Sequence, residues 1–328
     1  MVSHPLHGLP QPVGLLMEGG APTKAYWLQS ALEALETQRW IELHGASAPD
    51  HERLEQLGSL VVVRRLPGRW LHSLRQLRSK GKPVVLVLDD ALLDPAAVAE
   101  QRWHYRWRLW LGLTRHRHHL DQLVSDLWVT TGWLAEHSRG TLQGQGIRIL
   151  QLPLQPPLSL LHPGSIHRIA YLGSASHIEE WRWLLPLLEA LQQRRSDCLL
   201  ELVLPPGWRR RFRHLPRTRL FYPMDWETYL LDTGNRQVDL LLTPLLSSRF
   251  NQGRSPTKFF EAARLQAAGL FSNRAPYAGF VRDGHDGLLL DDTSDSWLRA
   301  IDQLLENKRQ RQAIAEHCLR RAEELCAR

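Results

Sequence analysis

The chain is 328 residues long with a mass of 37.8 kDa, roughly twice the size of an ordinary domain, so its length favours two domains. The composition, 43% hydrophobic and 23% charged, excludes a disordered, collagen-like or disulfide-scaffold protein, and no apolar run approaches the roughly 20 residues of a membrane-spanning helix. A net charge of +7 favours anionic partners, while the lack of a signal-peptide pattern and three scattered cysteines favour a cytoplasmic protein.

Short apolar runs alternate with amphipathic stretches through the first half of the sequence. The runs are continuous, as in the aliphatic stretch 84–88, which is typical of strands in a parallel sheet with helices over both faces. A basic, tryptophan-rich stretch over 101–119 predicts a helical region. We expect strands over 13–17, 40–43, 60–64, 84–88, 127–130 and 147–152, and helices over 24–35 and 70–79.

Four prolines between residues 153 and 163 break this pattern and predict a linker. A second alternation follows, with strands expected over 168–172, 199–204, 220–222, 238–242, 269–272 and 287–290, and helices over 178–193, from 225, from 255, over 295–306 and over 309–327. Two such arrays predict an α/β protein with two doubly wound, Rossmann-like domains facing across a cleft. Their expected bounds are 1–160 and 161–310, with a C-terminal helix over 311–328 that packs back on the N-terminal domain.

The clearest chemical signal lies where a helix follows a buried strand in the second half. Ser255 is a natural N-cap and Pro256 fits the first helical position. Lys258 then falls in the first turn, where the helix dipole disfavours a cation, and Arg249 and Arg254 lie close by. Positive side chains at this end predict a bound anion, because helix N-termini bind phosphate.

Glu261 lies three residues after Lys258 and therefore on the same helix face. A carboxylate there can accept hydrogen bonds from two ribose hydroxyls, while Lys258 and Arg254 bind a diphosphate. The alternative is a solvent-exposed Lys258–Glu261 pair, which stabilises a helix by about 0.2–0.5 kcal/mol. The spacing alone leaves both interpretations open.

A set of motifs in the second half resembles a known family. The motifs are Thr257–Ala263, Gly269–Ser272, Pro276-Tyr277, Asp283-Gly284, Asp286–Leu289, and Ala170–Ser174 with His177. Together they resemble the donor domain of GT-B glycosyltransferases, in the large retaining group related to glycogen and sucrose synthases (family 4 and its near relatives). In the first half, Val84–Asp90 and Leu127–Ala135 resemble the same family more faintly.

The resemblance implies a GT-B fold and transfer of a sugar from a nucleotide-sugar to a glycan or lipid-linked acceptor, with retention and without a metal or other cofactor. It implies that the N-terminal domain binds the acceptor and the C-terminal domain the donor, with Glu261 on the ribose and Lys258 and Arg254 on the diphosphate. The donor-binding residues that it implies are Gly173, Ser174, His177, Asn251, Arg254, Ser255, Thr257, Lys258 and Glu261. Many relatives carry a second glutamate where this chain has Gly253. An inactive GT-B scaffold or binding subunit therefore stays open as the alternative.

Two further places in the first half are candidates. Asp89 and Asp90 end a predicted strand and are the candidate catalytic residues, because carboxylates there can position an acceptor hydroxyl or act as a base; a helix cap is the alternative. The turn at Gly19 and Gly20 can approach a substrate, and Tyr26 either faces the same cleft or is buried.

The stretch 101–119 alternates tryptophans with arginines, which is typical of a membrane interface. We expect a peripheral contact there with the inner face of the membrane; the alternative is a helix whose tryptophan rings pack on the sheet. Arginines interleave its three histidines, so we expect no metal site. No nucleic-acid-binding signature is present in the sequence, and we expect no such partner.

Overall fold

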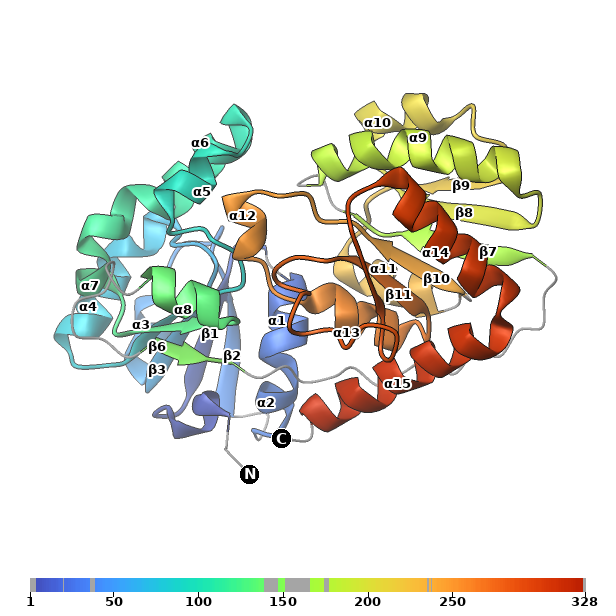
Figure 1. The fold of residues 1–328 in the computed structure, drawn as a ribbon. Coiled ribbons are helices and arrows are strands. Elements are labelled where there is room, and N and C mark those ends of the chain that lie inside the picture. Colours follow the sequence, from blue (N-terminus) through green and yellow to red (C-terminus); the bar gives the residue numbers. More distant parts are fainter. Residues whose placement is uncertain are drawn as a thin grey trace. The chain divides into compact units, whose positions relative to one another are not determined.

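The computed structural model describes residues 4–19, 21–35, 39–138, 147–150, 166–173, 177–234, 236 and 238–326. The predicted proline-rich linker lies outside these residues. The chain forms two compact units: unit 1 comprises 1–154, 248–255 and 325–328, and unit 2 comprises 155–247 and 256–324 (Figure 1). Unit 1 thus includes a short segment from the second half of the chain. The roles predicted for the two domains remain predictions.

Within the described residues, unit 1 contains a six-stranded parallel sheet in the order β2-β1-β3-β4-β5-β6. Its strands are β1 (Val13–Met17), β2 (Trp40–His44), β3 (Ser59–Val63), β4 (Val84–Leu88), β5 (Asp126–Val129) and β6 (Ile147–Ile149). Its helices are α1 (Ala21–Trp27), α2 (Gln29–Glu33), α3 (His51–Gln56), α4 (Leu71–Ser79), α5 (Pro95–Ala99), α6 (Trp103–Gly112), α7 (Leu120–Leu123), α8 (Gly132–Ser138) and α12 (Arg249–Gln252). The single helix predicted over 24–35 is therefore two helices.

The inner strands β1, β3 and β4 of this sheet are buried on both faces. Leu60 and Leu86 belong to a hydrophobic core that also takes in residues of α3–α8, whereas Val61 and Val85 on the opposite face are also fully buried. Phe250 from α12 belongs to the same core with no exposed surface. The α12 segment, orange in Figure 1, is therefore an integral part of unit 1 although 248–255 follows a strand of unit 2.

Unit 2 has, within its described residues, a second six-stranded parallel sheet in the order β12-β11-β10-β7-β8-β9. Its strands are β7 (His167–Tyr171), β8 (Cys198–Val203), β9 (Thr218–Phe221), β10 (Leu240–Thr243), β11 (Ala268–Ser272) and β12 (Leu288–Leu290). The helices are α9 (Ile178–Arg194), α10 (Pro206–Phe212), α11 (Trp226–Gly234), α13 (Thr257–Arg264), α14 (Ser294–Glu306) and α15 (Lys308–Cys326). Residues of α9, α10 and α14 share a core on one face of this sheet.

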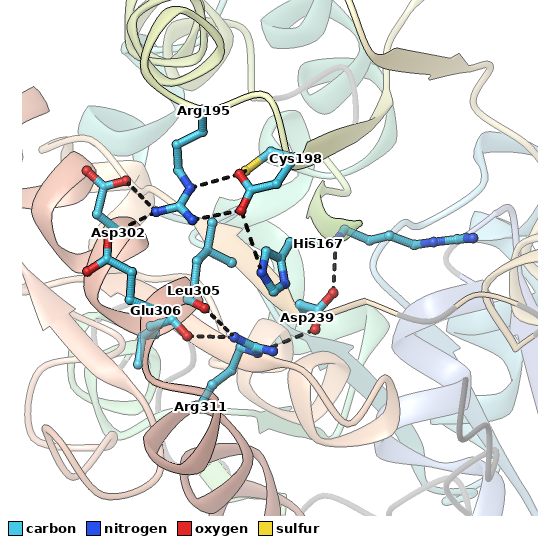
Figure 2. A network of polar contacts seen from close by, with 11 residues as sticks. His167, Arg195, Cys198, Asp239, Asp302, Leu305, Glu306 and Arg311 are labelled. Atoms are coloured by element: carbon cyan, nitrogen blue, oxygen red, sulfur yellow. Dashed lines mark hydrogen bonds and ion pairs between the residues drawn. The ribbon is translucent and has the colours of Figure 1, made fainter. Parts of the chain in front are cut away.

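A polar network lies at the amino ends of the unit 2 strands (Figure 2). Arg195 pairs with Asp197 at 2.8 Å, just before β8, and with Asp302 of α14 at 3.4 Å. Arg311 of α15 pairs with Asp239, just before β10, at 3.3 Å. These contacts tie the C-terminal helices to the end of the sheet opposite the one where ligands bind in such folds, so we assign the network a structural role.

Candidate functional site

Two motifs of the second half, the glycine turn after β7 and the start of α13, lie next to each other in unit 2. β7 ends in the turn at Leu172 and Gly173, and α13 begins at Thr257. Lys258 in the first turn of α13 donates a hydrogen bond from Nζ to the Leu172 carbonyl at 2.5 Å, across 86 residues of sequence. A Cβ on Gly173 would lie 2.7 Å from the Tyr171 ring, so a side chain here would have to displace that ring.

Glu261 is the buried partner of this lysine. Lys258 donates to its Oε2, and the guanidinium of Arg264 lies 3.9 Å from its Oε1. The Glu261 side chain is only 4% exposed and that of Lys258 is 25% exposed. Burial raises the pKa of Glu261 to about 7, against the opposing effect of Arg264. The pair is therefore formed, but it is largely withdrawn from solvent, unlike the surface pair that the sequence allowed.

The start of α13 differs from the prediction. The N-cap is Pro256, which offers no side-chain hydrogen bond, so the prediction of Ser255 as the cap is wrong. The Ser255 hydroxyl instead donates to the Asp89 carbonyl at 2.8 Å and lies 2.5 Å from the Thr130 hydroxyl, both in unit 1. Ser255 does not cap α13 because its hydroxyl forms hydrogen bonds with these partners, which lie far away in the sequence.

The donor-binding residues that the resemblance implies are divided between the two units. Asn251, Arg254 and Ser255 belong to unit 1, whereas Gly173, His177, Thr257, Lys258 and Glu261 belong to unit 2. Ser174 lies outside the described residues. Their assignment to the donor remains a prediction.

The positive side chains near residue 255 have carboxylate partners. Arg249 pairs with Asp94 at 2.6 Å, and an Arg254 guanidinium nitrogen lies 4.0 Å from Asp90; Lys258 pairs with Glu261 as described. The cluster therefore does not need an anion to balance its charge, and the bound anion itself stays a prediction. The carboxylates that pair with the two arginines come from the first half of the chain, where no local pattern points to them.

Asp89 and Asp90 lie in a polar cluster at the carboxyl end of β4. Arg64 donates to both carboxylates, at 2.6 Å in the case of Asp90, and the Thr23 hydroxyl donates to Asp89 at 2.8 Å. Burial raises the pKa of Asp89, with Arg64 opposing it. The helix-cap alternative is wrong, because the following helix begins at Pro95 and Asp94 caps it. The catalytic roles remain a prediction, and nothing in the sequence near Arg64 or Thr23 pointed to this cluster.

The glycine turn after β1 is described only in part. Gly19 has a φ of +80°, a conformation that suits glycine, whereas Gly20 lies outside the described residues. Tyr26 is 6% exposed, so the buried alternative is the one observed.

The α6 segment exposes its tryptophans. Trp103, Trp107 and Trp110 are 79%, 57% and 46% exposed, and the rings of the latter two stack with centroids 5.1 Å apart. The interpretation in which these rings pack on the sheet is wrong, because Leu109 fills the core instead, at 1% exposure. In the described part of the chain, no helix is both long and apolar enough to span a membrane, and no cluster of three potential metal-ligating side chains occurs.

No family model and no curated protein matches this chain, but solved structures do. Anabaena HepE in complex with UDP and glucose matches with a TM-score of 0.64 at 11% identity, over 95% of this chain and 94% of that one. A putative UDP-N-acetylglucosamine 2-epimerase from Listeria monocytogenes has a TM-score of 0.57 at 14% identity, over 96% and 94%. The pneumococcal O-GlcNAc transferase GtfA in complex with UDP and GlcNAc has a TM-score of 0.58 at 13% identity, over 84% of this chain and 55% of GtfA. This chain therefore spans about half the length of GtfA.

Each of these matches covers residues of both unit 1 and unit 2. The chain has the GT-B fold. The predicted fold class is thereby confirmed, as two doubly wound α/β units. A transferase and an epimerase both share this fold, so the activity of this chain has to be argued from its site.

Proposed function

We propose that this protein is a glycosyltransferase that moves a sugar from a nucleotide-sugar to a glycan or lipid-linked acceptor. The observation that carries the proposal is the hydrogen bond that Lys258 Nζ donates to the Leu172 carbonyl. It brings the glycine turn after β7 and the start of α13 together at the carboxyl end of the unit 2 sheet, where ligands bind in doubly wound folds. The matched structures with UDP and a sugar bound support the same donor class.

In this proposal, α13 binds the nucleoside diphosphate. Lys258 and the first amides of α13 contact the diphosphate, which accumulates charge as the sugar leaves, and this preorganised positive charge stabilises the leaving group. Glu261 accepts hydrogen bonds from the ribose hydroxyls. No protein nucleophile is required; we propose retention at the sugar, with a phosphate oxygen of the leaving group assisting deprotonation of the acceptor.

Binding requires the Lys258–Glu261 pair to open toward the ligand. Lys258 exchanges one carboxylate for the diphosphate, and Glu261 exchanges one ammonium for two hydroxyl donors. In both exchanges the charged group keeps at least one strong hydrogen-bond partner, so neither leaves a buried charge without a partner. The pair is therefore a suitable resting arrangement for a nucleotide site.

The test is a thermal-shift screen of UDP-, GDP- and ADP-sugars in buffer containing EDTA. We expect at least one of them to stabilise the wild type in a saturable way without added metal. Glu261→Ala removes that stabilisation, whereas Glu316→Ala, at an exposed position on α15, retains it. Stabilisation that is equal in the wild type and Glu261→Ala contradicts the ribose assignment.

The alternative is a GT-B scaffold without catalysis, and the absence of a carboxylate at Gly253 favours it. The two functions differ in turnover. A transferase releases nucleoside diphosphate from its donor when an acceptor is supplied, whereas a scaffold binds partners without releasing it.

We further propose Asp89 and Asp90 as the residues that position the acceptor hydroxyl. Replacing Asp90 with Asn then lowers kcat while nucleotide affinity is kept.

We also propose that α6 contacts the inner, cytoplasmic face of a membrane. What supports this is the exposure of Trp103 and Trp107 together with the charge of the segment. Residues 101–119 contain five arginines and no acidic residue. Tryptophan rings at headgroup level and arginines on anionic lipids are the two contributions that hold an interfacial helix.

A further inference from the structure

Arg64 has an unusual backbone conformation at the carboxyl end of the unit 1 sheet. It follows β3 directly and has a φ of +63°, in the left-handed region that costs free energy for any residue with a Cβ. Among the described residues, the other non-glycine residues with a positive φ are Arg217 and Gln266, which precede β9 and β11. The strained arginine therefore lies at the sheet end where doubly wound folds bind ligands.

The neighbouring strand β4 holds both ends of Arg64. The Arg64 amide donates to the Val87 carbonyl of β4 at 2.9 Å. The guanidinium donates from Nη1 to Asp89 and from Nη2 to Asp90, the latter at 2.6 Å. A guanidinium is a rigid, planar fork, so one side chain sets the spacing of two adjacent carboxylates, whereas the single ammonium of a lysine lacks this geometry.

The Arg64 guanidinium stays charged in this cluster. Its side chain is 22% exposed, and burial by itself lowers the pKa of Arg64. Asp89 and Asp90 outweigh burial and raise that pKa above its ordinary value. The second oxygen of Asp89 accepts a hydrogen bond from the Thr23 hydroxyl at 2.8 Å. Arg64 is thus the cation in direct contact with both carboxylates.

We propose that Arg64 is a positioning residue, whose guanidinium holds Asp89 and Asp90 in the geometry that receives an acceptor hydroxyl. A salt bridge that only neutralises buried charge needs a cation but no particular backbone conformation. A left-handed arginine is explained by a requirement for direction as well as charge, and strained residues of this kind cluster at active sites. The inference rests on the proposed function, because it assigns Arg64 a part in the same transfer.

The test measures release of nucleoside diphosphate from UDP-glucose, UDP-N-acetylglucosamine, GDP-mannose and ADP-glucose, with octyl glucoside as the acceptor. The variants are Arg64→Gly, because glycine suits a left-handed backbone, and Arg64→Lys, which keeps the charge. Arg217→Gly is the matched control, since it makes the same replacement at another positive φ. Each protein is assayed with and without ethylguanidinium, which replaces the missing group. Circular dichroism identifies the temperature at which every variant is folded.

We expect Arg64→Gly and Arg64→Lys to lower kcat about tenfold or more through misplaced carboxylates, while donor affinity stays within about twofold of the wild type. Ethylguanidinium restores turnover to Arg64→Gly in a saturable way, and it leaves the wild type and Arg217→Gly unchanged. If Arg64→Gly does not fold, Arg64→Lys provides the same comparison of kcat with donor affinity.

The pH dependence of kcat gives a readout that a purely structural role would not change. The acid limb of the profile moves up by about one pH unit or more in Arg64→Gly, because the carboxylates lose an adjacent cation. Asp90 keeps Arg254, whose guanidinium lies 4.0 Å away, and Tyr105 of α6 near it. Ethylguanidinium returns the limb toward its position in the wild type.

The inference is overturned if a folded Arg64→Gly or Arg64→Lys matches the wild type in kcat, if ethylguanidinium restores no turnover, or if donor affinity falls as much as kcat. The proposed function survives each of these outcomes, since the wild type turns over in all of them. A wild type that releases no nucleoside diphosphate from any of the four donors contradicts the proposed function, and the inference falls with it.

Discussion

Replacing Glu261 with glutamine should change how the stability of the protein depends on pH. The carboxyl is 4% exposed, and burial raises its pKa from the ordinary 4.5 to about 7. Protonation is thus favoured in the folded state more than in the unfolded state. The stability that this provides is complete below pH 4.5 and is lost as the pH rises through 7.

The size of the effect follows from those two pKa values. At about 1.4 kcal/mol per tenfold change in proton affinity, the site costs the wild type less than about 1 kcal/mol at pH 5 and about 3 kcal/mol at pH 8, relative to low pH. The free energy of unfolding therefore falls by about 2–3 kcal/mol between these two pH values because of this group. Glutamine cannot ionise, although its side-chain oxygen still accepts a hydrogen bond from Lys258, so the variant lacks this decline.

Urea denaturation at pH 5, 6, 7 and 8 measures the difference, with the wild type, Glu261→Gln and the exposed-site control Glu316→Gln compared at each pH. We expect the wild type and Glu316→Gln to lose about 2–3 kcal/mol more than Glu261→Gln over this range. Parallel curves for the wild type and Glu261→Gln would refute the reasoning. They would mean that the carboxylate is ionised throughout, with the Lys258 pair fully offsetting its burial.

Three more outcomes are expected. Nucleotide affinity of the wild type rises with pH through 7, because ribose binding uses ionised Glu261; affinity that is flat from pH 5 to 8 in calorimetry contradicts this. Phe250→Ala lowers the free energy of unfolding by about 3–5 kcal/mol because Phe250 is fully buried. The control Tyr222→Ala, at a site 56% exposed, costs under about 1 kcal/mol. Equal costs for the two variants in urea denaturation would show that the 248–255 segment is not part of the unit 1 core. The double variant Trp103→Ser/Trp107→Ser no longer sediments with phosphatidylglycerol vesicles that bind the wild type, and binding that survives the change argues against α6 as the membrane contact.

Local patterns predicted the strands and most of the helices. The aliphatic run 84–88 matches β4, and the helix expected over 178–193 ends one residue later, at Arg194, because continuous apolar runs and long helical periodicity depend on neighbouring residues only. The helix over 24–35 was predicted as one piece, and the structure divides it near Leu28. No glycine or proline marks that break inside the helix.

The site was predicted less completely, since its geometry depends on distant contacts. The three-residue spacing of Lys258 and Glu261 predicted that they meet, but not that the pair would be buried. Phe250, from the second half of the chain, lies in the core of unit 1. The Ser255 hydroxyl donates a hydrogen bond to the carbonyl of Asp89, directly after β4. Nothing adjacent to these residues in the sequence indicates such partners, so the division of the 251–261 segment between the two units could be learned only from the structure.

The central claim is that a nucleotide-sugar binds where the glycine turn after β7 meets the start of α13. The most direct test is calorimetric titration of the wild type and Lys258→Gln with UDP-, GDP- and ADP-sugars. The account predicts saturable binding of at least one of them to the wild type and affinity at least about tenfold weaker for Lys258→Gln, since a charge-assisted hydrogen bond to phosphate is worth about 1.5–3 kcal/mol. Binding of equal strength to both proteins, or to neither, would contradict it.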